Sequence, residues 1–232
     1  MCPYGSSKAS GPPRLTAVAA HEWAQLNPDA FDRRQVTVDD VANARMIAEP
    51  FTAFHCCLRT DGGGAVVLAS EDRARDLDVE PVWILGAAHR ASHVNMASWR
   101  DMTESPCVYS GAAAFRRAGV EPADIDVALL YDSFTSTLLL TLEGLGFCAR
   151  GEGGPFVASG AIGPGGSLPV NPDGGGLAAC HPGMRGMFLL VEAVRQLRGE
   201  AGDRQVNDAR LACVNATGGF FSAVSTMVLG LD

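Results

Sequence analysis

Apolar residues recur along this chain with two spacings, and these predict a mixture of helices and strands. From Arg14 to Gln25 the apolar side chains fall on one helical face. Thr37, followed by two acidic residues, is typical of a helix start, and we expect that helix to reach Ala48 before Pro50. Further helices are predicted over residues 106–119, 136–145 and 184–197, with a short one capped near residues 70–72.

Continuous apolar runs predict the strands. Ala65–Ala69 is wholly apolar, which is typical of a strand covered on both faces. Other strands are predicted over residues 81–88, 125–130 (as a central strand), 210–215 and 223–229, the last two joined by the turn 217–222. Because strands alternate with helices and two strands close the chain, the pattern predicts an α/β fold, with a mixed β-sheet layered between helices.

Composition narrows the class of protein. Of 232 residues, 47% are hydrophobic and 19% charged, enough apolar material for a sizeable core. The net charge is −8 and there is no run of Lys and Arg, which argues against a nucleic-acid partner. The longest apolar run is too short for a membrane span. Seven scattered cysteines without a CxxC pair indicate reduced thiols and a cytoplasmic protein.

One segment, Gly174–Gly186, is the best candidate for chemistry. It carries three consecutive glycines and then His181 on a turn fixed by Pro182, directly ahead of an apolar helix. An imidazole held rigidly at such a place is suited to acid–base work, because its pKa lies near neutrality. The alternative is a histidine that only fixes the loop by bonding to backbone. A long glycine-rich irregular segment, 151–176, precedes it and is itself typical of a functional loop.

Four segments together resemble the C-terminal half of a thiolase. The nearest branch is that of the sterol-carrier-protein-x or lipid-transfer thiolases, with the steroid side-chain aldolases beside it. Tyr131-Asp132-Ser133-Phe134 is similar to the family's His-Asp-x-Phe or Asn-Glu-x-Phe motif. Asn171–Gly186 resembles Asn-x-x-Gly-Gly…Gly-His-Pro-x-Gly, and Ala216–Gly219 resembles the Cys-x-Gly-Gly turn. Asn27-Pro28 and residues 46–62 resemble the stretch that leads from the thiolase loop region into the second half.

The resemblance implies a division of the chain and two departures from the family. Residues 1–45 correspond to the end of the loop region and residues 46–232 to the C-terminal-half domain. The half that carries the acyl-accepting cysteine is not in the sequence, and Ala216 stands where the second catalytic cysteine is expected. Cys213 lies three residues too early. Thiolysis needs a thiolate nucleophile and a second cysteine as acid and base, so these departures favour another reaction.

Roles for individual residues follow from the resemblance. His181 would donate to the thioester oxygen, and Tyr131 would take the β-hydroxyl proton in a retro-aldol cleavage. Gly218 and Gly219 would bring backbone N–H groups toward the thioester oxygen. The remaining motif positions, expected to brace the turn or bind substrate, are Asp132, Asn171 and Gly175. The plainer alternatives are a tyrosine that caps a strand end and a tight turn between two strands.

Metal and cysteine chemistry are not expected. Cys56 and Cys57 are adjacent, which makes them poor chelators, and His89 and His93 have no further ligands near them in sequence. Cys180 is a neighbour of His181 on a loop, where neighbouring side chains rarely face one another, so we expect a small buried filler.

Three hypotheses remain open at this stage. The first is an enzyme that acts on coenzyme A thioesters in lipid or sterol side-chain degradation, by acyl transfer or by retro-aldol cleavage. The second is a non-catalytic half-thiolase subunit, and the third is a truncated product without activity of its own. The resemblance implies an acyl-CoA substrate, no covalently bound cofactor, and either a homo-oligomer or a chain that supplies the missing half. A small OB-fold protein with a zinc ribbon is a further expected partner.

Overall fold

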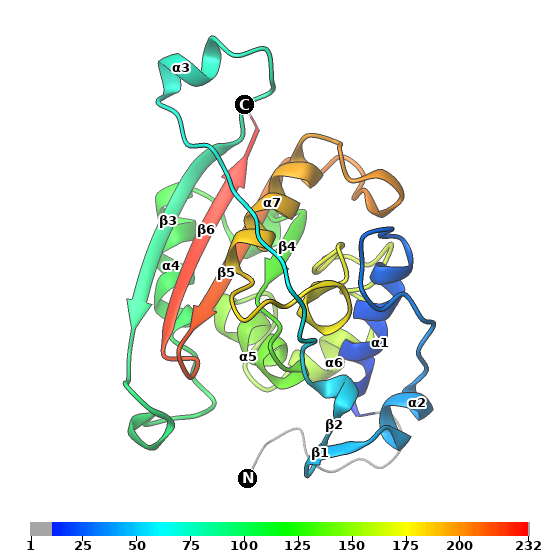
Figure 1. The fold of residues 1–232 in the computed structure, drawn as a ribbon. Helices are drawn as coiled ribbons and strands as arrows, with labels where there is room; N and C mark the ends of the chain where they lie inside the picture. Colours follow the sequence, from blue (N-terminus) through cyan, green and yellow to red (C-terminus); the bar gives the residue numbers. More distant parts are fainter. Residues whose placement is uncertain (1–10, 232) are drawn as a thin grey trace.

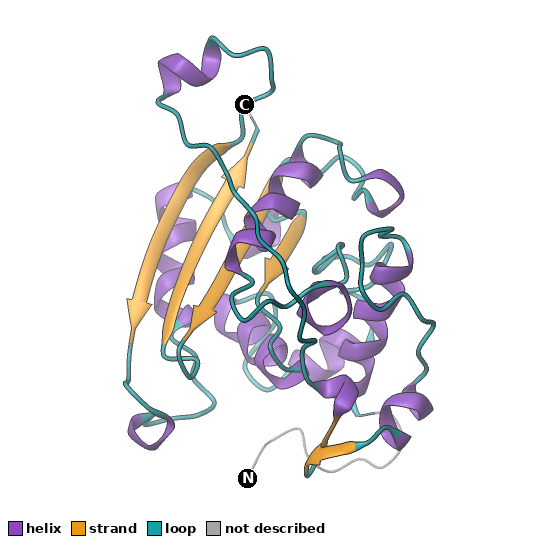
Figure 2. Cartoon of the chain, in the orientation of Figure 1, coloured by secondary structure: helices purple, strands orange, loops and turns teal. Residues whose placement is uncertain are grey.

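The computed structural model describes residues 11–231, which form a mixed sheet between helices (Figures 1 and 2). The strand order is β3-β6-β5-β4, where β4 is parallel to β5 and the other pairs are antiparallel. The α/β fold predicted from the sequence is therefore confirmed. The strands are β3 (Trp83–Ala91), β4 (Val127–Leu130), β5 (Leu211–Gly218) and β6 (Ala223–Gly230).

Side chains of β4 alternate between two apolar clusters, as the period of a strand requires. Ala128 and Leu130 enter one cluster, which α4 (Cys107–Ala118) and α5 (Thr135–Leu145) cover. Val127 and Leu129 enter the other cluster, beneath α7 (Gly186–Leu197). Because both faces of the sheet are covered, the position where β4 ends is fixed from both sides.

The N-terminal part packs against the same body. Helix α1 (Pro12–Gln25) contacts α6 (Gly153–Ala158) and a single π-helical turn, η4 (Gly175–Ala179). The indole N–H of Trp23 donates to the carbonyl of Ile162 at 2.9 Å. The remaining elements are α2 (Val38–Asn43), β1 (Met46–Ala48), β2 (Phe51–Thr52), α3 (Glu71–Arg75) and the 3-10 turns Ala53–His55, Met96–Ser98, Pro122–Asp124 and Gly202–Arg204.

Three predicted details were wrong. The helix that starts at Thr37 ends at Asn43, because residues 46–48 pair with β2 as a short strand instead. The strand over 125–130 is not central: β4 is last in the strand order, with only an isolated bridge from Ala128 to Val170 beyond it. The segment 151–176 is also less irregular than expected, since it contains α6 and the start of η4.

The predicted strand Ala65–Ala69 is also wrong. In the described chain no strand lies beside this segment, so its backbone has no ladder partner. The segment follows Gly62 and Gly64, which pack against side chains of α7. A Cβ added to Gly64 would lie 3.2 Å from the side chain of Met187. Figure 1 shows the segment crossing in front of that helix. Val67 is 94% exposed and Leu68 is 78% exposed.

Candidate active site

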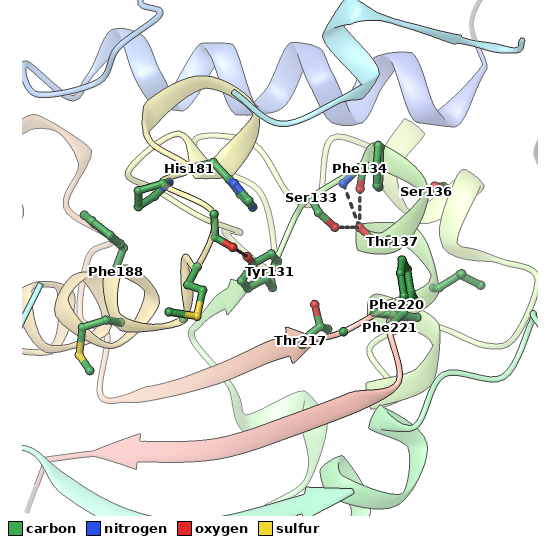
Figure 3. A pocket seen from close by; sticks show the side chains of 18 of the residues that line it. Tyr131, Ser133, Phe134, Ser136, Thr137, His181, Phe188, Thr217, Phe220 and Phe221 are labelled. Carbon is green, nitrogen blue, oxygen red and sulfur yellow. Dashed lines mark hydrogen bonds between the residues drawn. The ribbon is translucent and has the colours of Figure 1, made fainter. Parts of the chain in front are cut away.

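A cavity of about 1320 Å³ lies where β4 and β5 end, next to the first turns of α5 and α7. Four of the predicted site residues line it: Tyr131, His181, Gly218 and Gly219. Figure 3 shows Tyr131 and His181 side by side in this space, with Thr217 near them. The fold therefore brings together motifs that lie about 40 to 90 positions apart in sequence.

Tyr131 is the first residue after β4, and its backbone N–H extends the ladder by donating to the carbonyl of Asn215 at 2.9 Å. Its hydroxyl accepts a hydrogen bond from the backbone N–H of Arg185 at 3.3 Å and makes a long one to the carbonyl of Gly183, 3.5 Å. Burial raises the pKa of the phenol. At neutral pH Tyr131 is therefore uncharged and anchored to the loop that carries the histidine.

His181 meets Tyr131 edge to face, with ring centroids 5.4 Å apart and an interplanar angle of 90°. Its backbone N–H donates to the hydroxyl of Thr60 at 3.0 Å, which fixes the loop. The ring atom Nε2 is buried and has no hydrogen-bond partner among the described residues. Burial lowers the pKa of the imidazole, although the nearby Asp132 carboxylate opposes this. A neutral imidazole with a free nitrogen can accept or donate a proton at pH 7.

The other predicted residues of the two motifs do not line the cavity. Asp132 is buried behind it and accepts hydrogen bonds from the backbone N–H groups of Gly176 (2.7 Å) and Leu177 (3.3 Å). Asn171 uses its side-chain amide to bond both backbone groups of Leu130, at 2.7 and 2.8 Å. These residues form the frame that holds Tyr131 and the glycine loop, and their contact with a substrate stays a prediction.

Gly218 and Gly219 end β5 and open the turn to β6. Gly219 has φ of 62°, and a Cβ there would lie 2.5 Å from the hydroxyl oxygen of Ser222. A Cβ on Gly218 would meet nothing within 4 Å. Both glycines line the cavity, and Gly218 is open on the side where a Cβ would lie. An oxyanion-binding role for their N–H groups stays a prediction, since a plain tight turn has the same geometry.

The cavity wall contains residues that sequence reasoning missed. Sulfur and aromatic side chains dominate it, and Ser133, Ser136 and Thr137 add hydroxyl groups at the start of α5. Methionine and aromatic side chains adapt to bulky apolar ligands. Alternation or motif spacing gives no signal for them, because they come from three separate parts of the chain, residues 96–102, the start of α7 with the loop before it, and the β5–β6 turn: Met96, Trp99, Met102, Met184, Met187, Phe188, Phe220 and Phe221.

No cysteine of residues 11–231 lines the cavity. The sulfur of Cys180 lies 3.2 Å from the hydroxyl of Thr60, and Cys213 is buried in the core beneath α4, where burial raises its pKa strongly. All six cysteines in the described range are free. This part of the chain therefore offers no thiolate nucleophile to a ligand in the cavity.

Residues 11–231 lack two further kinds of feature. No group of three or more His, Cys, Asp or Glu side chains is arranged to hold a metal ion. None of the helices in that range is long and apolar enough to cross a membrane.

The sequence pattern of the family described as "Thiolase C-terminal domain-like" matches residues 88–231, more than half of the chain. The chain belongs to the thiolase family. Its matched region holds both motifs that meet in the cavity, so the family predicted from the sequence is confirmed.

Relatives in this family carry different activities in their names. An acetyl-CoA acetyltransferase of Methanothermobacter thermautotrophicus is 36% identical over 221 residues, 94% of this chain and 57% of the relative. A steroid side-chain-cleaving aldolase of Thermomonospora curvata is 39% identical over 222 residues, 93% of this chain and 56% of the relative. Sterol carrier protein 2 of Oryctolagus cuniculus is 33% identical over 219 residues, 89% of this chain and 39% of the relative.

Solved structures agree on the fold. A structure described as an Ltp2-ChsH2(DUF35) aldolase superposes with a TM-score of 0.89 at 36% identity, over 99% of this chain and 60% of that chain. Human mitochondrial 3-ketoacyl-CoA thiolase gives a TM-score of 0.68 at 18% identity, over 95% of this chain and 55% of that chain. The second likeness concerns the fold alone. This chain spans little more than half the length of several full-length thiolase-family proteins.

Proposed function

We propose that this chain provides the second half of an enzyme that cleaves a carbon–carbon bond in a β-hydroxyacyl-CoA thioester, in the degradation of lipid or sterol side chains. One observation carries the proposal. Tyr131 and His181 line a single cavity that no cysteine of residues 11–231 enters. Among relatives, the steroid side-chain-cleaving aldolase supports cleavage, and the acetyl-CoA acetyltransferase supports a thioester substrate.

The proposed reaction is a retro-aldol cleavage. Tyr131 takes the proton of the β-hydroxyl group, the bond between the α and β carbons breaks, and the β carbon leaves as a carbonyl compound. The electron pair of the broken bond passes into the thioester as an enolate, whose oxygen is stabilised by His181 and by the backbone N–H groups at Gly218 and Gly219. Protonation of the α carbon then releases a shortened acyl-CoA.

Product analysis tests the reaction. The chain, alone and with any protein that co-purifies from its source, is incubated with a β-hydroxyacyl-CoA that carries a bulky ring system. Retro-aldol cleavage yields a carbonyl compound and a shortened acyl-CoA without consuming free coenzyme A. The matching β-ketoacyl-CoA with free coenzyme A is tested in parallel, because acyl transfer needs a β-carbonyl and would consume free coenzyme A in proportion to product. Binding of the thioester without either product would contradict the proposed reaction.

A non-catalytic subunit is the second candidate function. The exposed apolar segment Ala65–Ala69 favours it, because such a segment is suited to contact with another chain. In that case the chain would complete the fold of another chain, which would supply the remaining half. Reconstitution separates the two: activity that survives both Tyr131→Phe and His181→Ala belongs to the partner chain.

Partner and compartment follow the same proposal. The solved aldolase whose description pairs Ltp2 with ChsH2(DUF35) supports a complex with a second, small protein, and an OB-fold protein with a zinc ribbon is our candidate. A homo-oligomer is the alternative. Six free cysteines in the described range support a reducing compartment such as the cytoplasm.

A further inference from the structure

The reaction proposed above uses neither the charge nor the burial of Arg185, which lies one residue ahead of α7. We propose that Arg185 is the positioning residue of this site, which holds the His181 loop and the Tyr131 hydroxyl in one fixed arrangement. The inference deepens the proposed function and rests on it for its effect on turnover. The fixed arrangement of the His181 loop and the Tyr131 hydroxyl does not depend on any reaction.

The guanidinium of Arg185 is fully buried, with 0% of its side chain exposed. Nη2 donates to both carboxylate oxygens of Asp173, at 2.7 and 2.6 Å. Nε lies 3.5 Å from Oδ1 of Asp132. One cation therefore faces two buried carboxylates, and burial raises the pKa of Asp132 while the guanidinium opposes that rise.

Two further bonds connect Arg185 directly to the site residues. Nη1 donates to the carbonyl of Cys180 at 3.0 Å, and that carbonyl belongs to the peptide group whose N–H is that of His181. The backbone N–H of Arg185 donates to the Tyr131 hydroxyl at 3.3 Å. A single residue therefore fixes the plane of the peptide before the histidine and the position of the phenol oxygen.

The surrounding packing leaves this arrangement little freedom. A Cβ on Gly176 would lie 3.0 Å from Oδ1 of Asp132, 3.0 Å from Cδ2 of His181 and 3.2 Å from Cδ of Arg185. The Asp132 carboxylate, the His181 imidazole and the Arg185 side chain thus all lie against Gly176. A small displacement of Arg185 must move the histidine ring, because close-packed interiors transmit such shifts.

Stability alone does not explain a buried ion cluster of this kind. Removing charges from water is costly, and an apolar side chain of similar volume often stabilises a protein as well or better. The planar guanidinium of Arg185 bonds three acceptor atoms in fixed directions, which suits it to holding the loop of His181 in place. The cluster also lies directly behind the cavity, where geometry determines the rate.

The test compares Arg185→Lys with Arg204→Lys. Arg204 also forms a buried two-nitrogen pair, with Glu192 (3.0 Å for each bond), but it bonds neither the His181 loop nor Tyr131. Each variant keeps the positive charge but loses the planar guanidinium, which bonds several acceptor atoms at once. The readouts are thermal stability, the ¹H–¹⁵N imidazole signals and pKa of His181 (assigned by their absence in His181→Ala), and kcat and KM.

Arg185→Lys is expected to displace the His181 signals and to raise its pKa toward the ordinary value of an imidazole, because a loosened loop admits water. It should lower kcat about 30- to 100-fold and change KM less than about threefold, as expected for a misplaced catalytic group. Arg204→Lys should lose comparable stability and leave His181 and kcat unchanged. The inference is overturned if His181 in Arg185→Lys keeps the pKa that it has in the wild type. It is also overturned if Arg204→Lys shifts the pKa of His181 by the same amount.

If Arg185→Lys does not fold, the variant Arg185→Met with Asp173→Asn removes the cation together with one carboxylate. It should show the same displacement of His181, and an unchanged His181 would overturn the inference. The two levels of the account fail separately. Absence of turnover in the wild type contradicts the proposed function but leaves the His181 titration as a full test. Wild-type turnover with an unaffected kcat in Arg185→Lys contradicts only the role of Arg185.

Discussion

At the scale of single residues, the site depends on how closely the glycine loop approaches Asp132. Gly175 has φ of 69°, and a Cβ there would lie 2.1 Å from Oδ2 of Asp132. A side chain at this position would therefore be strained by its backbone and would also collide with a buried carboxylate. The loop that carries His181 starts from this contact, so its loss should affect both folding and the site.

We expect Gly175→Ala to lower the free energy of unfolding by about 2–4 kcal/mol, because it adds a steric clash to left-handed backbone strain. Gly183→Ala is the matched control: φ is 84°, but a Cβ would meet nothing within 4 Å. Its cost should be about 1 kcal/mol, from backbone strain alone. Chemical denaturation of both variants checks this, and equal losses would contradict the contact with Asp132.

The ionisation of Tyr131 makes a second prediction. Burial raises its pKa, with Cys57, Asp132 and Arg185 as the charged or ionisable groups near the phenol. The basic phenolate is therefore scarce at pH 7, and its fraction grows about tenfold per pH unit below the pKa. We expect kcat/KM of the proposed cleavage to rise with pH from 7 to 9, and this rise to disappear in Tyr131→Phe.

Tyr109→Phe is the control for this pH profile, because Tyr109 is an exposed tyrosine with a raised pKa outside the main cavity. Its profile should match that of the wild type. A wild-type profile that stays flat between pH 7 and 9 would argue against Tyr131 as the base.

At the scale of elements, local signals predicted most of the fold. Gly119 and Gly146 adopt left-handed conformations directly after α4 and α5, where the sequence placed the ends of these helices. The hairpin of β5 and β6 was also predicted, because two apolar runs flank a short turn that contains glycine. His181 was predicted from its rigid glycine-rich turn, and Tyr131 from the resemblance to a thiolase motif.

Other features depend on partners that a local pattern does not contain. Ala65–Ala69 has the composition of a buried strand, but no strand in the described chain is available to pair with it. Arg185 resembles any charged residue at a helix start. Its importance comes from Asp132 and Asp173, which are distant or unremarkable in sequence and meet it only in the fold. The Met and aromatic wall of the cavity is missed for the same reason.

The exposed segment makes a prediction at this scale. An apolar strand-forming run that is exposed promotes association with a sheet edge of another chain. We expect the isolated chain to self-associate in size-exclusion chromatography, and Val67→Glu with Leu68→Glu to shift it toward the monomer. The control is Met46→Glu with Ile47→Glu, which changes two exposed apolar residues of β1 and should have little effect. A clean monomer for the wild type would contradict the prediction.

At the scale of the whole molecule, this chain matches little more than half the length of several thiolase-family relatives and places two of their motifs around one cavity. The proposed cleavage depends on the cooperation of Tyr131 with His181 across that cavity. Groups that act as one unit have strongly non-additive effects on rate when they are removed together.

The most direct measurement is a double-mutant cycle on kcat/KM for release of the carbonyl product, with Tyr131→Phe, His181→Ala and the double variant. Each single change should lower kcat/KM by about 100-fold or more. The kcat/KM of the double variant should be only slightly below that of the less active single variant. Turnover that survives both single changes, or losses that simply multiply in the double variant, would contradict a shared site.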